Sequence, residues 1–250
     1  MKKNTLLLLG AALIATMVSG LISCQKENKT EADTALAAED RSNPNSAVYP
    51  PTAHVNGKSY SEWTADWWRW AAGIPCATNP IGDPTGANAG INQSGPVYFL
   101  AGTFGGAVTR NVTIPHGKKI LFPIINLLMD HPCPDPNFGP APGQSLEEFL
   151  TESAAELVDL AGGLEVTLDG VALNNEENYR FPSGLFYFTG NPDLTNCFDP
   201  CITGEEQAGA SDGYWMILKP LSRGQHTLHF QAGVPAFGFS LDVTYNITIQ

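Results

Sequence analysis

The chain has 250 residues, with 13 Lys and Arg side chains against 25 Asp and Glu, and a formal net charge of −12. An acidic surface of this kind repels nucleic acid and anionic lipid headgroups, so we expect neither as a partner. Hydrophobic residues make up 43% of the chain, enough for a sizeable core, while 25 glycines and 19 prolines predict many turns.

The first residues read as a secretory signal. Lys2 and Lys3 precede a mostly apolar run over residues 6–18, and small residues follow before Cys24. The sequence "LISC" at residues 21–24 resembles the lipobox of bacterial lipoproteins. The resemblance implies that residues 1–23 are removed and that acylated Cys24 attaches the chain to a lipid bilayer. The alternative is a plain secreted protein with a chance cysteine at this place.

The segment after Cys24 predicts a tether and a cellular location. Residues 24–47 are polar, charged and free of aromatic side chains, which is typical of a disordered linker. Gln25 stands where an Asp would resemble the signal for retention in the inner membrane, so we expect an outer-membrane lipoprotein. "QKEN" at residues 25–28 also resembles the tag that sends some such proteins to the cell surface.

Four cysteines remain beyond Cys24, namely Cys76, Cys133, Cys197 and Cys201. An even number in an oxidising compartment favours two disulfides, with three possible pairings. We expect Cys197 to pair with Cys201 across a tight turn, and Cys76 with Cys133. A zinc site is the alternative, but no CxxC or HxxxH spacing supports it, and we expect no metal.

Residues 48–250 predict one domain, which is mainly β and resembles a β-sandwich with two packed helices. Capping boxes at Ser59 with Glu62 and at Ser145 with Glu148 open the two helices, which we expect to end near Gly73 and at the glycine pair 162–163. Strict alternation over residues 239–250 indicates a strand with one wet face. Runs such as "KILFPII", "LFYF" and "YWMILKPL" predict strands covered on both faces, and "PLSRGQHTLHF" indicates a hairpin.

The first predicted helix carries four of the five tryptophans. Helical periodicity places one apolar stripe on it, which we interpret as core: Tyr60, Trp63, Trp67, Trp70, Ala71 and Ile74. Trp68 lies about a quarter-turn to the side of this stripe. Its position fits either packing in a second layer or an exposed platform for a ligand.

A long connection rich in Pro, Gly, Asn and Asp follows this helix over residues 75–95. It is either a functional loop or a structural loop pinned by a disulfide through Cys76. The Trp-rich helix, "NPIGDPTG", "QSGPVYFLAGTFGG", "IPHGKKILFPIIN" and "DGYWMILKPLSRGQHTLHF" together resemble a family of secreted bacterial proteins with no assigned activity. The resemblance covers about residues 60–130 and 210–250, supports one domain and implies no catalytic residue.

Motifs for nucleophilic, phosphate-binding, zinc-protease or EF-hand chemistry are absent from the sequence, and we expect no cofactor. Arg110 shares a strand face with apolar residues, so we expect it to be buried and paired with a carboxylate. His226 is predicted to be a hydrogen-bonded core residue, and His229 faces the other way. Asp193, Asn196 and Asp199 offer oxygen ligands at a spacing that fits no known calcium loop.

Three functions are compatible with these residues. The first is a surface-anchored protein that binds an extracellular glycan or another polar ligand. Its candidate site combines the helix edge, the 75–95 loop and the polar end of a strand: Trp68, Asp83, Gln93, Asn126, Asp130 and His131. The second is a hydrolase in which Asp83, Asp130 and His131 act as acid and base. The third is a structural component of an envelope assembly.

Overall fold

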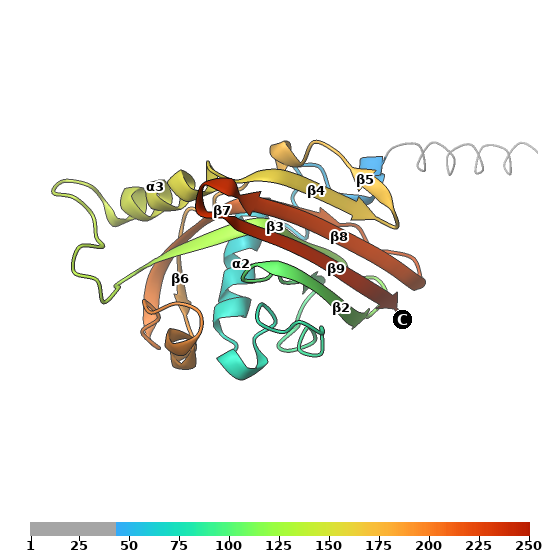
Figure 1. Ribbon diagram of the computed structural model, residues 1–250, viewed down its shortest axis with the longest axis horizontal. Helices are drawn as coiled ribbons and strands as arrows, with labels where there is room; N and C mark the ends of the chain where they lie inside the picture. The colour runs from blue at the N-terminus through green and yellow to red at the C-terminus, as the bar shows by residue number, and fades with distance from the viewer. Residues whose placement is uncertain (1–43) are drawn as a thin grey trace, which may run out of the picture. The chain divides into compact units, whose positions relative to one another are not determined.

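Two β-sheets face each other in the computed structural model, which describes residues 44–250 (Figure 1). Sheet 1 has the strand order β1 (Val97–Phe99), β3 (Lys119–His131), β7 (Glu206–Leu218) and β6 (Leu185–Thr189). Sheet 2 has the order β2 (Gly106–Ile114), β9 (Phe239–Ile249), β8 (Gly224–Val234), β4 (Gly162–Leu168) and β5 (Val171–Leu173). The pairs β1–β3 and β2–β9 are parallel, and the other pairs are antiparallel. The predicted β-sandwich-like fold is therefore confirmed.

Helices α2 (Tyr60–Ala72) and α3 (Leu146–Val158) pack on sheet 1. Short 3₁₀ turns complete the elements: η1 (Pro44–Ala47), η2 (Cys76–Thr78), η3 (Glu176–Tyr179), η4 (Pro192–Asn196) and η5 (Pro235–Phe237). The turn η1 overlaps the end of the predicted tether, so residues 44–47 form a 3₁₀ turn where a disordered linker was expected. The predicted signal peptide, Cys24 and the rest of the tether up to residue 43 lie outside the described residues. Within residues 44–250, no helix has both the length and the apolarity to cross a bilayer.

The inner faces of the two sheets form the main core. Strand β9 alternates as predicted, with every second residue from Leu241 to Ile249 buried. The ring of Phe122 on β3 lies 5.2 Å from that of Phe230 on β8, so the two sheets meet through aromatic contacts. Phe230 in turn stacks on Tyr245 of β9. Each such ring removes about 150 to 250 Å² of surface from water, which makes these contacts a main source of cohesion.

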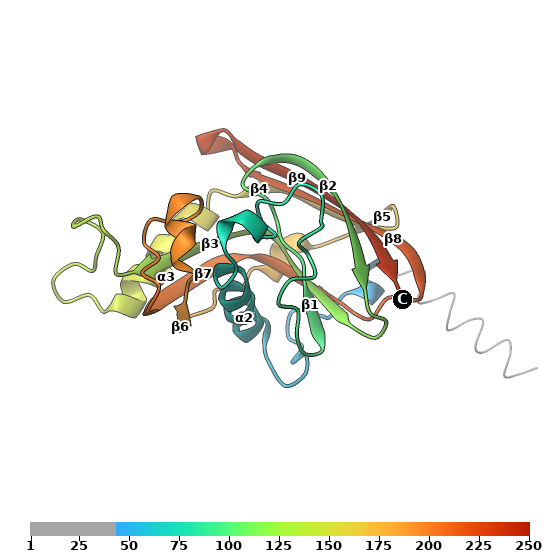
Figure 2. The ribbon, with the colours of Figure 1, turned by 90° about the horizontal axis from the view of Figure 1, so that it is seen from below.

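Helix α2 covers the opposite face of sheet 1. Trp215 and Met216 are neighbours on β7 and point to opposite faces; Met216 pairs with Phe122 on the inner side, and Trp215 contacts Trp67 at 5.3 Å. Figure 2 shows α2 on the side of β3 and β7 away from β8 and β9. Both bonds of the predicted capping box at Ser59 are present. The apolar stripe is buried throughout, as expected.

Helix α3 begins at its predicted capping box but ends before the glycines. The Ser145 box is complete, and Leu150 packs against Ala208 and Ala210 of β7. The helix ends at Val158, and the glycine pair 162–163 already belongs to β4. Leu160, which follows the helical period, is consequently 44% exposed. The predicted end was wrong because residues 162–163 are needed at the start of a strand.

Two strand predictions need correction. The segment "PLSRGQHTLHF" connects β7 in sheet 1 to β8 in sheet 2, so it crosses between sheets and forms no hairpin. Turn residues indicate a reversal of the chain but cannot show whether the next strand stays in the same sheet. The run "LFYF" forms β6 at the edge of sheet 1, where Tyr187 is 54% exposed, so this strand is covered on one face only.

Both expected disulfides form, but with the other pairing. Cys76 bonds to Cys197, and Cys133 bonds to Cys201. The segment 197–201 lies between two elements: η4, which ends beside η2 and Cys76, and the end of β3, which leads to Cys133. Nearness in sequence favoured Cys197 with Cys201, whereas the fold places a different partner beside each sulfur.

Paired cysteine variants distinguish the two arrangements. In Cys76→Ala with Cys197→Ala we expect no free thiol among residues 44–250, because the remaining pair is bonded. In Cys197→Ala with Cys201→Ala we expect Cys76 and Cys133 both to be free, because each has lost its partner. Thiol titration of the denatured, unreduced proteins measures this, and the reverse result would contradict the pairing.

The interior of the fold holds a cation. Arg110 on β2 is 1% exposed, which confirms the predicted inward orientation. The expected carboxylate partner is wrong, since among residues 44–250 its guanidinium makes no ion pair within 4.0 Å. It donates instead to four main-chain carbonyls and one hydroxyl, at distances of 2.6 to 3.0 Å: Ile81 O, Asp83 O, Ala101 O, Gly102 O and Tyr245 Oη. The planar fork of an arginine matches such a set of acceptors.

Arg110→Lys tests this arrangement, because lysine keeps the charge but has one nitrogen instead of three. We expect a loss of about 3 kcal/mol or more in the free energy of unfolding, since buried carbonyls lose their donors. Urea unfolding followed by tryptophan fluorescence measures it. Arg223→Lys is the control, because Arg223 is exposed. Equal stability of the two variants would show that the fork is not needed.

Candidate functional site

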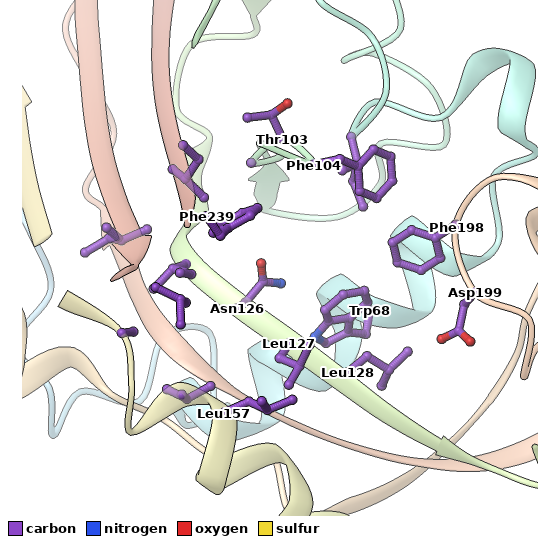
Figure 3. Close-up of a pocket in the computed structure, with 18 of the residues that line it drawn as sticks. Trp68, Thr103, Phe104, Asn126, Leu127, Leu128, Leu157, Phe198, Asp199 and Phe239 are labelled. Carbon is purple, nitrogen blue, oxygen red and sulfur yellow. The ribbon is translucent and has the colours of Figure 1, made fainter. Parts of the chain in front are cut away.

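A cavity of about 450 Å³ opens at the end of the sandwich where sheet 1 extends beyond β1 (Figure 3). Its wall combines α2, β3, the end of α3 and the start of β9 with the segments 102–104 and 198–199. We call it the β3-edge pocket. Its volume lies in the range of about 300 to 1,000 Å³ that is usual for small-molecule sites.

The free edge of β3 forms the middle of this pocket. Strand β1 pairs with β3 only as far as Phe99 and Leu121, and the chain then turns away into residues 101–104. Five consecutive residues of β3, Ile124–Leu128, line the pocket. Adjacent side chains of a strand point to opposite faces, so five in a row border a cavity only along the strand's edge. A bulge between Pro123 and Ile125 lies at the same place, as bulges beside functional sites often do.

The walls and the entrance of the pocket are apolar. Leu127, Leu128 and Leu157 line the interior, together with Phe239. Phe104 and Phe237 line it as well and are 51% and 65% exposed. Large apolar side chains at such exposure are uncommon in the molecule, and these two lie at the pocket. The entrance is thus suited to an apolar molecule.

Few polar side chains reach the pocket. Trp68 Nε1 and Asn126 Nδ2 are buried there without a hydrogen-bond partner in the described part of the chain. Thr103 donates to the carbonyl of Gly105 at 3.4 Å, and Asp199 accepts from the main-chain nitrogen of Cys201. Asp199 is the one charged residue of the lining. Among its side chains, the pocket therefore offers two unpartnered donors and a single negative group.

Trp68 is a wall of this pocket and not an exposed platform. Its side chain is 4% exposed and lies between Trp67, at 5.0 Å, and Phe198, at 6.0 Å. Of the two interpretations of its position on the helix, second-layer packing is correct. Segment 198–199 covers Trp68, and the helical period of α2 alone does not predict this contact.

Asp83 and Gln93 hold the 75–95 loop together and do not line the pocket. Asp83 is 8% exposed; burial raises its pKa, but hydrogen bonds from Asn88 and Thr85 outweigh this and bring the pKa below its usual value. Gln93 bonds to both main-chain groups of Phe99. The disulfide at Cys76 pins the start of the loop, so its contacts favour the structural interpretation.

Asp130 lies at the far end of β3, outside the pocket lining, and is paired with a second acid. It is 2% exposed and accepts from Gln207 Nε2 at 2.5 Å. Burial, followed by the charge and hydrogen bond of Asp199, raises the pKa of Asp130 to about 8. Asp130 therefore keeps its proton near neutral pH and is hydrogen-bonded to Asp199. Because Asp199 also lines the pocket, this pair connects the end of β3 to the site.

Asp130→Asn removes this titration while keeping an acceptor for Gln207. In the folded protein the pKa of Asp130 is about 8, above the ordinary value of 3.8. The folded state therefore binds this proton more tightly than the unfolded state, and the stability gained in this way is lost as the pH rises from 3.8 to about 8. From about pH 5 to about pH 9, we expect the melting temperature of the natural protein to fall by at least about 3 °C more than that of Asp130→Asn. Calorimetry measures it, with exposed Glu156→Gln as the control. Parallel profiles would contradict the raised pKa of Asp130.

The histidines lie apart from the pocket. His131 follows Asp130 on β3 and therefore points to the other face, so the two do not converge as an acid and a base. His226 bonds to Asp169 at 2.7 Å with its side chain 13% exposed, so it lies at the margin of the core and not inside it. His229 faces away and bonds to Asp242 at 3.0 Å.

The acidic groups near residues 193–201 serve the local backbone. Asp193 accepts from Cys76 N, and the Asn196 amide donates to Asp193 O. Asp130, Asp199 and Cys201 bring ligand-type atoms within 4.8 Å of one another, but the sulfur of Cys201 is in a disulfide and is no thiolate ligand.

Of the six candidate residues, the structure brings Trp68 and Asn126 together in the pocket. Sequence reasoning missed the apolar lining, above all Phe104, Leu157, Phe198 and Phe237. A signal did exist for two of them: Phe104 and Phe237 each stand in a connection next to a glycine, where an aromatic side chain has no strand or helix to pack it. No protein-family model, curated protein or solved structure matches the chain. The resemblance to secreted bacterial proteins therefore stays an expectation.

Proposed function

We propose that this protein binds an apolar small molecule in the β3-edge pocket. The main observation behind this proposal is an apolar cavity of about 450 Å³ whose entrance holds two exposed phenylalanines, Phe104 and Phe237. Exposed apolar surface costs free energy in water, at about 25 cal/mol per Å², and an apolar ligand that covers it recovers this energy. Such a pocket with few polar groups is typical of a binding site.

The glycan hypothesis loses its main support. It depended on Trp68 as an exposed platform and on the polar groups of the 75–95 loop, whereas Trp68 is buried and the loop's side chains bond within the loop. The hydrolase hypothesis depended on a cleft shared by Asp83, Asp130 and His131. None of the three lines the pocket, and adjacent Asp130 and His131 point to opposite faces. A binding role therefore fits the geometry better than either.

The proposal includes the cellular location of the protein. Acylation at Cys24 would attach the chain to the outer membrane, with the cell surface as the further possibility that "QKEN" suggests. A protein held at a bilayer by a linker of about twenty residues stays close to a source of apolar molecules. The support for this is the sequence alone, and mass spectrometry of the membrane-extracted protein for a lipid on Cys24 tests it.

Filling the pocket tests the binding function. Leu157 lines it from α3, whereas Leu160, three residues on, is 44% exposed and outside the lining. We expect the hydrocarbon probe diphenylhexatriene to bind the purified protein, Leu157→Trp to weaken binding by about tenfold or more, and Leu160→Trp to leave it unchanged. Probe fluorescence measures the affinity. Absence of binding to the natural protein would reject the function and favour a structural role in an envelope assembly.

A further inference from the structure

The four tryptophans of α2 differ in one respect. Trp63, Trp67 and Trp70 each donate their indole N–H to a main-chain carbonyl, at 2.8 to 2.9 Å. The indole N–H of Trp68 is buried without a partner, and this residue lines the β3-edge pocket. A buried donor without an acceptor costs about 1 to 3 kcal/mol. The helix thus carries one unsatisfied donor, on the tryptophan at the cavity.

Asn126 supplies a second polar group to the same cavity. Its amide nitrogen is buried and unpartnered, and it projects from the β3 edge into the pocket (Figure 3). Figure 3 shows the indole nitrogen of Trp68 on the side of the ring nearer to β3. An indole only donates, so the group that satisfies Trp68 must be an acceptor. A carbonyl oxygen with two lone pairs is able to accept from both side chains.

The charge of the lining limits what this acceptor is. Lys, Arg and His are absent from the lining, and Asp199 is its one charged residue. A carboxylate bound here would leave water for an apolar cavity without a cation to pair with it and near a negative group, both of which are unfavourable. A neutral ester or amide carbonyl has the same acceptor oxygen without that cost.

We infer that the pocket selects a neutral apolar ligand with a carbonyl group, such as an acyl ester or amide, and that Trp68 Nε1 and Asn126 Nδ2 donate to the carbonyl oxygen. The inference depends on the proposed binding function and names its ligand class. Apolar walls hold the chain of the ligand, while the two donors fix its polar end. A free fatty acid of the same length is discriminated against by its charge.

Two probes that differ in charge at the polar end test the ligand class. Methyl decanoate and decanoate share the acyl chain and the carbonyl, but decanoate is ionised at about pH 7. In displacement of diphenylhexatriene from the purified protein, we expect methyl decanoate to bind about tenfold or more tightly than decanoate. Decylamine, which carries a cation and no carbonyl, is expected to bind more weakly than the ester.

Side-chain variants test the two donors. Trp68→Phe and Asn126→Leu each remove one donor, and we expect each to weaken methyl decanoate by about fivefold. The affinity for diphenylhexatriene, a hydrocarbon without an acceptor, should fall less than the affinity for the ester in both variants, so the ratio of the two affinities reports the lost donor. Trp215→Phe is the matched control: Trp215 is fully buried with an equally unpartnered indole N–H, but it does not line the pocket. Neither ligand should respond to it.

The outcomes separate the two proposals. If diphenylhexatriene and methyl decanoate both fail to bind, the binding function itself is wrong. If diphenylhexatriene binds but decanoate or decylamine equals the ester, the pocket stands and the ligand class is overturned. Equal loss of ester and hydrocarbon in Trp68→Phe and Asn126→Leu would likewise overturn the role of the donors, because the variants would then act through packing.

Discussion

The hydrogen bonds of one buried cation determine where the pocket is. Arg110 extends from β2 into the interior and binds carbonyls at two places in the long connection between α2 and β2, at Ile81 and Asp83 and at Ala101 and Gly102. Those acceptors replace water around a charge that would otherwise be costly to bury. Because Thr103 and Phe104 follow Gly102 directly, the same bonds position the entrance of the pocket.

The pocket follows from a mismatch of lengths in sheet 1. Strand β3 has thirteen residues and its partner β1 has three, so the edge of β3 is open beyond Leu121. Helix α2 covers one side of this edge, and α3 with the start of β9 covers the other. Neither reaches across, and the space between them is the cavity. The unequal lengths of β3 and β1 thus leave a cavity beside the main core.

Local patterns in the sequence predicted the elements well, because capping boxes and alternation depend on neighbouring residues. Ser59 with Glu62 and the run from Phe239 to Ile249 are examples. The sequence did not predict the sheet to which β8 belongs, the partner of Cys197 or the cover over Trp68. Each of these depends on contacts between distant segments. The pocket is the extreme case, since its lining comes from residues as far apart as 67 and 241.

The segment 197–201 joins three features that the sequence shows only as a short cysteine spacing. A disulfide holds each end, to Cys76 near α2 and to Cys133 beyond β3. Between them, Phe198 packs on Trp68, and Asp199 is hydrogen-bonded to Asp130. The two disulfides hold this segment over Trp68, so that Trp68 is buried in the lining of the cavity. They also hold a carboxyl group at that wall, so the same five residues border the cavity and supply the one charged group of its lining, which disfavours anions.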